Sequence, residues 1–172
     1  MLQTPDTVST LREILTQCRT IAVVGLSPQW HRPSHFAAKY MQAHGYRIIP
    51  VNPLVAKEGG EVLGEKAWTS VTEAAAALKQ DGVHIDMVDC FRKSEDIPPI
   101  ADEAIAIGAK CLWLQLGVFA GDATGAKVEA AGLQVIQNRC VKIEHARLFG
   151  GLGWMGVNTK VISAKRLQQL PY

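Results

Sequence analysis

Short apolar runs alternate with amphipathic segments along most of the chain. The run at residues 20–26 is apolar at almost every position, which is typical of a parallel strand buried on both faces. Similar runs predict strands at residues 46–51, 84–90, 111–116 and 133–137. Strands that alternate with helices form parallel sheets with right-handed crossovers. We therefore expect an α/β fold, a single Rossmann-like domain with a doubly wound parallel sheet of about five strands.

Capping residues mark the ends of the segments between these strands. Pro33 suits the first turn of a helix, and Gly45 suits its C-terminal end. Ser70 and Glu73 have the spacing of a capping box. A Gly-rich connection also predicts one short strand at residues 61–63. The expected helices span residues 7–18, 33–44, 70–79, 94–107, 119–131 and 140–149.

The domain organisation is expected to be simple. Residues 1–149 read as one domain, because nothing between residues 20 and 149 resembles a linker. Residues 150–172 read as a C-terminal extension that begins with a flexible but apolar Gly-rich stretch. Two interpretations of this extension stay open, a loose tail or an arm that packs on a partner subunit, so a homo-oligomer is possible.

Composition and charge limit the partners and the compartment. The 172 residues are 48% hydrophobic and 20% charged, and the net charge of +2 provides no global basic field for nucleic acid or membrane. No stretch has the length and apolarity of a membrane span. The first 18 residues lack the apolar core of a signal peptide, so we expect a cytoplasmic protein. The four cysteines have no zinc or redox spacing, and Cys90 and Cys111 are expected as buried thiols.

The segment after the first strand is the candidate ligand site. In an open parallel sheet, ligands bind beyond the carboxyl ends of the strands, at the switch point. Gly25 permits close approach of the backbone, Ser27 and Ser34 offer hydroxyls, and Arg32 offers a forked cation just before a helix that starts at Pro33. These residues predict a diphosphate cradle; the alternative is a plain strand-to-helix turn.

A standard dinucleotide site does not fit the residues. The G-x-G-x-x-G fingerprint is absent after the first strand. The second strand ends at Asn52-Pro53, where an NAD site requires an acid for the ribose hydroxyls. Lys57 follows and suits a phosphate on the ribose, as in coenzyme A (CoA) and less well in NADP. Lys57 as an ordinary solvated lysine is equally compatible with the sequence.

Several collinear motifs carry a family resemblance over roughly residues 10 to 149. The chain resembles the stand-alone CoA-binding domain family, which is similar to the N-terminal CoA-binding domain of the succinyl-CoA synthetase α subunit. The motifs are Gly25-Leu26-Ser27-Pro28, His31-Arg32-Pro33-Ser34, and the segments 45–53, 86–92, 108–110, 113–117 and 138–144.

The resemblance implies a Rossmann-like fold that holds CoA across the strand ends. It assigns the loop from Gly25 to Ser34 to the phosphates and the segment at Asn52 and Pro53 to the adenosine half. It makes Lys57 a candidate for the 3′-phosphate. The rest of the groove is then closed by Phe91, Arg92 and the segment Gln115-Leu116-Gly117.

No catalytic residue is assigned from the sequence. The chain is too short to hold the second synthetase domain, so we expect a non-catalytic or regulatory module that binds CoA or acyl-CoA. One alternative is an acyl-CoA-acting enzyme that uses Cys140, its pKa lowered by a helix N-terminus, or a partner chain. The other is an NADP-binding oxidoreductase. No metal site is expected, because Pro33 separates His31 from His35.

Overall fold

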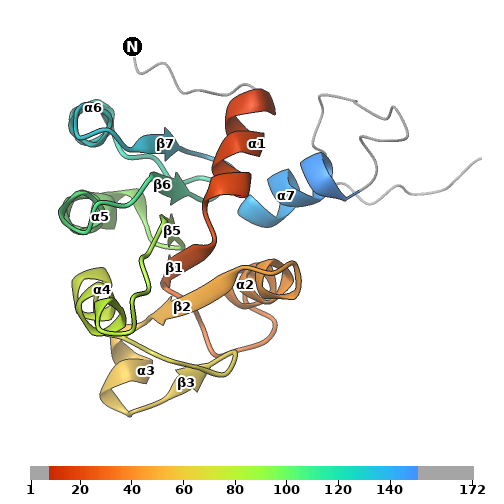
Figure 1. Cartoon of the computed structure of the whole chain (residues 1–172), viewed down its shortest axis with the longest axis vertical. Coiled ribbons are helices and arrows are strands. Elements are labelled where there is room, and N and C mark those ends of the chain that lie inside the picture. The colour runs from red at the N-terminus through yellow and green to blue at the C-terminus, as the bar shows by residue number, and fades with distance from the viewer. Residues whose placement is uncertain (1–7, 151–172) are drawn as a thin grey trace, which may run out of the picture.

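The computed structural model describes residues 8–150, and a five-stranded parallel sheet lies at its centre (Figure 1). The strand order is β2-β1-β5-β6-β7, and every neighbouring pair is parallel. The strands are β1 (Thr20–Val24), β2 (Arg47–Val51), β5 (Met87–Cys90), β6 (Cys111–Leu114) and β7 (Gln134–Ile136). This confirms the predicted Rossmann-like α/β fold.

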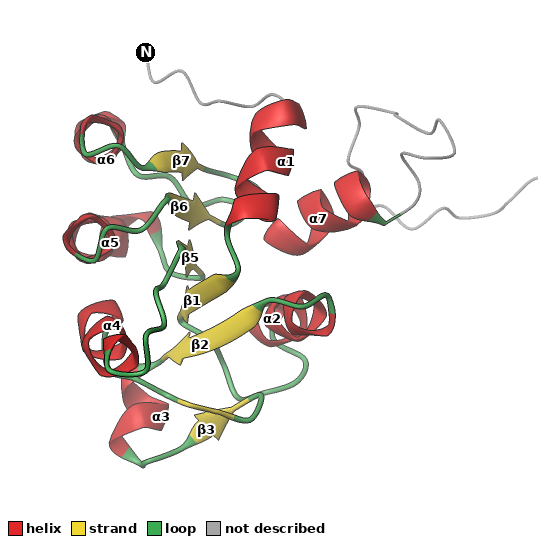
Figure 2. Ribbon diagram, viewed as in Figure 1, coloured by secondary structure: helices red, strands yellow, loops and turns green. Residues whose placement is uncertain are grey.

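Helices cover both faces of the sheet (Figure 2). One face carries α1 (Val8–Gln17), α2 (Pro33–Ala43) and α7 (Val141–Phe149). The other carries α4 (Val71–Lys79), α5 (Ile97–Ala106) and α6 (Asp122–Ala130). Within residues 8–150 no helix has the length and apolarity to cross a membrane. The predicted extension, residues 150–172, lies outside the described residues apart from Gly150.

Alternate side chains of the strands supply two separate cores. Ala22, Val88 and Leu112 face α4, α5 and α6 in one cluster. Val23 and Trp113 face α1, α2 and α7 in the other. Both layers are needed because a parallel sheet is apolar on both faces. The predicted buried thiols of Cys90 and Cys111 are confirmed as free cysteines inside these cores.

The chain direction across the sheet reverses next to β1. From β1 the chain crosses through α2 to β2 on one side, and later returns to β5 on the other side. In the register, Val24 lies opposite both Val51 and Cys90, so the three strands end together. This reversal is a topological switch point, and the carboxyl edge of the sheet opens there.

Several predicted boundaries are corrected by the structure. The helix predicted from residue 119 begins at Asp122, because Gly121 has φ +76°, outside the helical region. The helix predicted from residue 94 is divided into a 3₁₀ turn, η1 (Ser94–Asp96), and α5. The strand predicted from residue 84 begins at Met87. Other predicted ends differ by one or two residues, as is usual for frayed termini.

The connection between β2 and α4 contains more structure than the sequence predicted. A short helix, α3 (Pro53–Lys57), follows β2 directly, and no helix was expected there. The strand predicted at residues 61–63 is observed as β3 (Glu61–Val62). It pairs with β4 (Glu65–Lys66) in an antiparallel hairpin that was not predicted.

Candidate functional site

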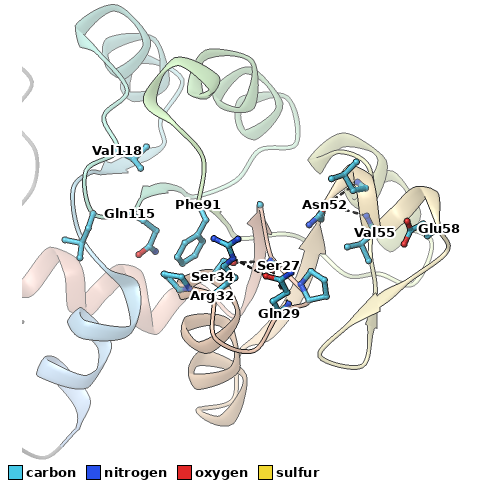
Figure 3. Close-up of a pocket in the computed structure, with 15 residues that line it drawn as sticks. Ser27, Gln29, Arg32, Ser34, Asn52, Val55, Glu58, Phe91, Gln115 and Val118 are labelled. Atoms are coloured by element: carbon cyan, nitrogen blue, oxygen red, sulfur yellow. Dashed lines mark hydrogen bonds between the residues drawn. The ribbon is translucent and has the colours of Figure 1, made fainter.

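A groove of about 680 Å³ runs along the carboxyl edge of the sheet. This volume lies in the range of about 300–1,000 Å³ that is typical of small-molecule sites. Figure 3 shows the groove extending from Gln115 and Val118, past Phe91 and Arg32, to Asn52, Val55 and Glu58. The lining residues are Gly25, Ser27, Pro28, Gln29, Arg32, Pro33, Ser34, Asn52, Leu54, Val55, Glu58, Phe91, Gln115, Leu116 and Val118.

Gly25 is required where the chain leaves β1. Its φ of +85° is costly for any residue with a side chain. A Cβ on Gly25 would also lie 2.6 Å from the carbonyl oxygen of Phe91. The glycine therefore brings the loop after β1 against the end of β5, and this contact forms the floor of the groove.

Two serine hydroxyls hold the loop in shape before any ligand arrives. The backbone N–H of Ser27 donates to Oγ of Ser34 at 3.0 Å, and that of Gln29 donates to Oγ of Ser27 at 3.1 Å. Each hydroxyl oxygen acts here as an acceptor, so its own proton stays available for donation. The loop thus offers two preorganised O–H donors to an anion.

Arg32 is the cation of this loop. It precedes α2 and is exposed, and its Nε donates to Oε1 of Gln29 at 3.2 Å. Among residues 8–150 it forms no ion pair, whereas Arg92 is held by Asp96 at 2.9 Å. The guanidinium of Arg32 therefore has donors left for a phosphate oxygen.

Asn52 anchors the far side of the groove. Its Oδ1 accepts from the backbone N–H groups of Leu54 and Val55, at 3.1 and 3.4 Å, and so caps α3. Its Nδ2 donates to the carbonyl oxygen of Leu26 at 2.9 Å. Both polar atoms of the amide are in use, so Asn52 fixes α3 against the loop after β1.

The other predicted site residues lie in three places. Phe91 and Gln115 line the groove. Pro53 and Arg92 line an adjoining cavity of about 430 Å³, which shares Gly25, Asn52, Leu54 and Phe91 with the groove. Lys57 and Gly117 line neither cavity.

Several lining residues on α3 and after β6 were not predicted. They are Leu54, Val55, Glu58 and Val118. Glu58 follows α3 directly, and a helix that was not predicted leaves no pattern to place it. Val118 follows the predicted segment from Gln115 to Gly117, so its position in the chain was the available signal. Leu116, within that segment, lines the groove as expected.

One buried carboxyl lies next to the groove. Oδ1 of Asp89, on β5, accepts from Nε2 of Gln115 at 2.6 Å. Only 2% of Asp89 is exposed. Burial raises the pKa of Asp89 to about 7, although the hydrogen bond from Gln115 acts in the opposite direction.

The structure corrects the expected lowering of the Cys140 pKa. Cys140 precedes α7, and the N–H groups of Lys142 and Ile143 lower its pKa as expected for a helix N-terminus. Burial has the larger effect, and the net result is a raised pKa. Glu144 is not available for a water or cation, because it pairs with Arg139 and Arg147 while only 1% exposed.

Comparisons with known proteins agree with this architecture. The fold and the groove define a Rossmann-like domain with an open groove at its switch point. The chain belongs to the CoA binding domain family, whose model matches residues 19–146.

Relatives of similar length share this domain. The uncharacterized protein YneT of Bacillus subtilis (strain 168) is 40% identical over 136 residues, which is 79% of this chain and 92% of YneT. A hypothetical protein from Pyrococcus horikoshii OT3 is 36% identical with a TM-score of 0.75. The match covers 86% of this chain and 96% of the Pyrococcus protein. A Thermus thermophilus protein is 33% identical with a TM-score of 0.70, and the match covers 83% and 99% of the two chains.

Proposed function

We propose that the protein binds CoA in the groove, with the diphosphate on the loop between Gly25 and Ser34. The observation that carries this proposal is the guanidinium of Arg32, which lacks an ion-pair partner among the described residues and lies beside two preorganised hydroxyls. Charged donors at a helix start are the usual arrangement for phosphate binding. Membership of the CoA binding domain family supports the same ligand.

The two ends of the groove suit the two halves of CoA. The adenosine half would lie toward Asn52, Val55 and Glu58, where the Glu58 carboxylate accepts from a ribose hydroxyl or the adenine amino group. Lys57, in the last turn of α3, remains the proposed partner of the 3′-phosphate. Pro53 and Arg92 would reach this half from the adjoining cavity.

The pantetheine arm suits the opposite end. Phe91, Leu116 and Val118 provide an apolar wall, and Gln115 provides an amide for the polar groups of the arm. Gly117, directly after Leu116, positions this segment through the bond from its N–H to Oδ1 of Asn138 at 2.8 Å. An apolar wall with few polar groups is typical of small-molecule sites.

A carrier or regulatory role fits the groove better than catalysis. No cysteine or histidine is among the described residues that line it, so a nucleophile with its base is not assembled there. Cys140 has a raised pKa and lies outside the lining. An NADP site has less support as well, because the G-x-G-x-x-G fingerprint is absent after β1.

Calorimetric titration of CoA into the wild type and Arg32→Ala tests the proposal. We expect the variant to bind about 10- to 100-fold more weakly, because a hydrogen bond to a charged group contributes about 1.5–3 kcal/mol. Arg47→Ala is the matched control, since Arg47 pairs with Glu65 at the start of β2. Equal affinity in all three proteins would contradict a diphosphate contact by Arg32, and tighter binding of NADP than CoA would favour the oxidoreductase alternative.

A further inference from the structure

Asp89 is a buried carboxyl to which the proposed function assigns no role. Its neighbours in the register are Val23 on β1 and Trp113 on β6, and both belong to the apolar cluster beneath α1, α2 and α7. Its one hydrogen-bond partner in the described part of the chain is Gln115, a residue that lines the groove. Burying an ionised carboxyl in apolar surroundings lowers the stability of the fold. Buried carboxyls with shifted pKa values cluster at functional sites, so we expect a role of Asp89 in the groove.

Asp89 determines which end of the Gln115 amide, the NH₂ group or the oxygen, points into the core. An ionised carboxylate only accepts hydrogen bonds, so the NH₂ group of Gln115 must point inward to Asp89. Within residues 8–150, Oε1 of Gln115 receives no hydrogen bond, and no fully buried side-chain nitrogen or oxygen lacks a partner. Oε1 is therefore not fully buried, and it belongs to a side chain that lines the groove next to Phe91 (Figure 3).

We propose that Asp89 is a positioning residue that holds Gln115 so that the groove presents a carbonyl acceptor to an amide N–H of the pantetheine arm. The proposal rests on the proposed function, because it assumes CoA in the groove. A free glutamine amide pairs equally well with the N–H or the C=O of a ligand amide. A glutamine amide held by Asp89 can only accept a hydrogen bond from the ligand N–H, and this sets the position of the pantetheine arm along the groove. Because the side chain is already ordered, no conformational entropy is lost in ordering it on binding.

The groups that face Asp89 leave it as the titrating residue of this region. Burial raises the pKa of the nearby thiols of Cys90, Cys111 and Cys140, so these are neutral near pH 7. The buried residues of α2 include no titratable group. On α7, Glu144 is ion-paired with two arginines, and burial lowers the pKa of His145 below its ordinary value, which keeps the imidazole neutral at pH 8. When Asp89 is protonated it becomes a donor that can pair with Oε1, and the amide is then free to turn.

Two ligands distinguish an effect of Asp89 on the position of Gln115 from an effect of Asp89 on the stability of the fold. CoA carries the pantetheine arm, whereas adenosine 3′,5′-bisphosphate retains the phosphoadenosine half without it. Both are titrated into the full-length wild type, Asp89→Leu and Gln115→Met by calorimetry at pH 8. We expect Gln115→Met to lower the CoA affinity about tenfold and Asp89→Leu to lower it about fivefold, because the amide must then be ordered on binding. The affinity for the bisphosphate should stay unchanged in both variants.

A pH series adds a readout that a merely structural role would not change. The bisphosphate also has a 5′-phosphate monoester that titrates at about pH 6, so the readout is the ratio of CoA to bisphosphate affinity in the wild type relative to the same ratio in Asp89→Leu. All titrations of the two ligands cancel in this comparison. The wild-type ratio should fall relative to that of Asp89→Leu between pH 8 and pH 6, as Asp89 is protonated.

The outcomes separate this proposal from the proposed function. If the wild type binds neither ligand, the proposed function is wrong and the role of Asp89 falls with it. If the wild type binds both ligands and the variants keep the same ratio, CoA binding stands and the positioning role is overturned. Equal loss of both ligands in Asp89→Leu also overturns it, because the residue would then act through the fold alone.

Discussion

At the scale of single residues, the site is held in shape by side chains that have little contact with bulk water. Oγ of Ser34 and the amide of Asn52 use their acceptor atoms to fix the loop and α3. Asp89 does the same for Gln115 from inside the core. A preorganised site loses less entropy on binding than one that must be ordered by its ligand. For Asp89, this arrangement has a cost in stability.

Replacing Asp89 with Asn should stabilise the protein above pH 7. The pKa of Asp89 rises from an ordinary 3.8 to about 7 on folding. The contribution of such a carboxyl to stability is full below its unfolded pKa and is lost as the pH rises through 7. At about 1.4 kcal/mol per pK unit, ionised Asp89 costs on the order of 4 kcal/mol at pH 8, and Asn avoids this cost.

Urea unfolding of the wild type and Asp89→Asn at pH 8 and pH 5 measures this difference. The excess stability of the variant should be largest at pH 8 and shrink as the pH falls toward the unfolded pKa of 3.8, below which the wild-type carboxyl is protonated in both states. An excess that does not change with pH would show that Asp89 does not titrate in this range.

The sequence predicted the single residues of the site where they follow a strand. Gly25, Arg32 and Gln115 were expected at the carboxyl edge, and all three line the groove. The pair between Asp89 and Gln115 was not predictable, because it depends on which strands are neighbours and in which register. Lys57 was predicted at the site because it follows β2 by a few residues in the sequence. The helix α3 lies between β2 and Lys57, and Lys57 lines neither cavity.

At the scale of elements, α7 is held to the domain by a buried carboxylate. Glu144 accepts from Nη1 of Arg139 at 3.1 Å and pairs with Nη2 of Arg147 at 2.5 Å. The two guanidinium groups are about a quarter exposed, so water solvates them in part. The arrangement links α7 to the segment that follows β7, and it lies outside the groove lining.

Glu144→Gln should therefore lower stability without changing ligand affinity. The isosteric amide removes the charge that both arginines face, and hydrogen bonds to charged groups contribute about 1.5–3 kcal/mol. We expect the free energy of unfolding in urea at pH 7 to fall by about 2 kcal/mol, with the CoA affinity unchanged. Glu61→Gln on β3 is the control, because Glu61 is exposed and forms no ion pair within the described residues. A weaker CoA affinity in Glu144→Gln would show that α7 contributes to the site.

Helices and strands that are long enough to show a regular spacing of apolar residues were predictable from the sequence, and shorter elements were not. The buried strands and the helices of nine or more residues produce enough apolar positions to reveal their spacing. By contrast, α3 has five residues, none of them buried, and its signals are a capping Asn52 and a Pro53 at the first position. Those two residues equally mark the end of a strand, which is how the sequence analysis interpreted them.

At the scale of the whole molecule, the residues that line the groove at the switch point come from a limited part of the chain. The described lining residues all lie between Gly25 and Val118. The order of the strands brings the ends of β1, β5 and β6 together, although α2, α3, α4 and α5 separate them in sequence. A domain that ends near residue 149 would thus contain the complete site, as the predicted boundary requires.

A chain that ends after Gly150 should bind CoA as tightly as the full-length protein. Binding to the native state raises the free energy of unfolding by RT ln(1 + [L]/Kd), or about 2.7 kcal/mol at a ligand concentration of 100 Kd. This increase should be equal in the two chains and reduced to about 0.4–1.4 kcal/mol in Arg32→Ala at the same CoA concentration, as follows from 10- to 100-fold weaker binding. Thermal unfolding with and without CoA, together with calorimetry, measures both quantities. A smaller increase in the shortened chain would place part of the site within residues 151–172 and contradict the proposed domain boundary.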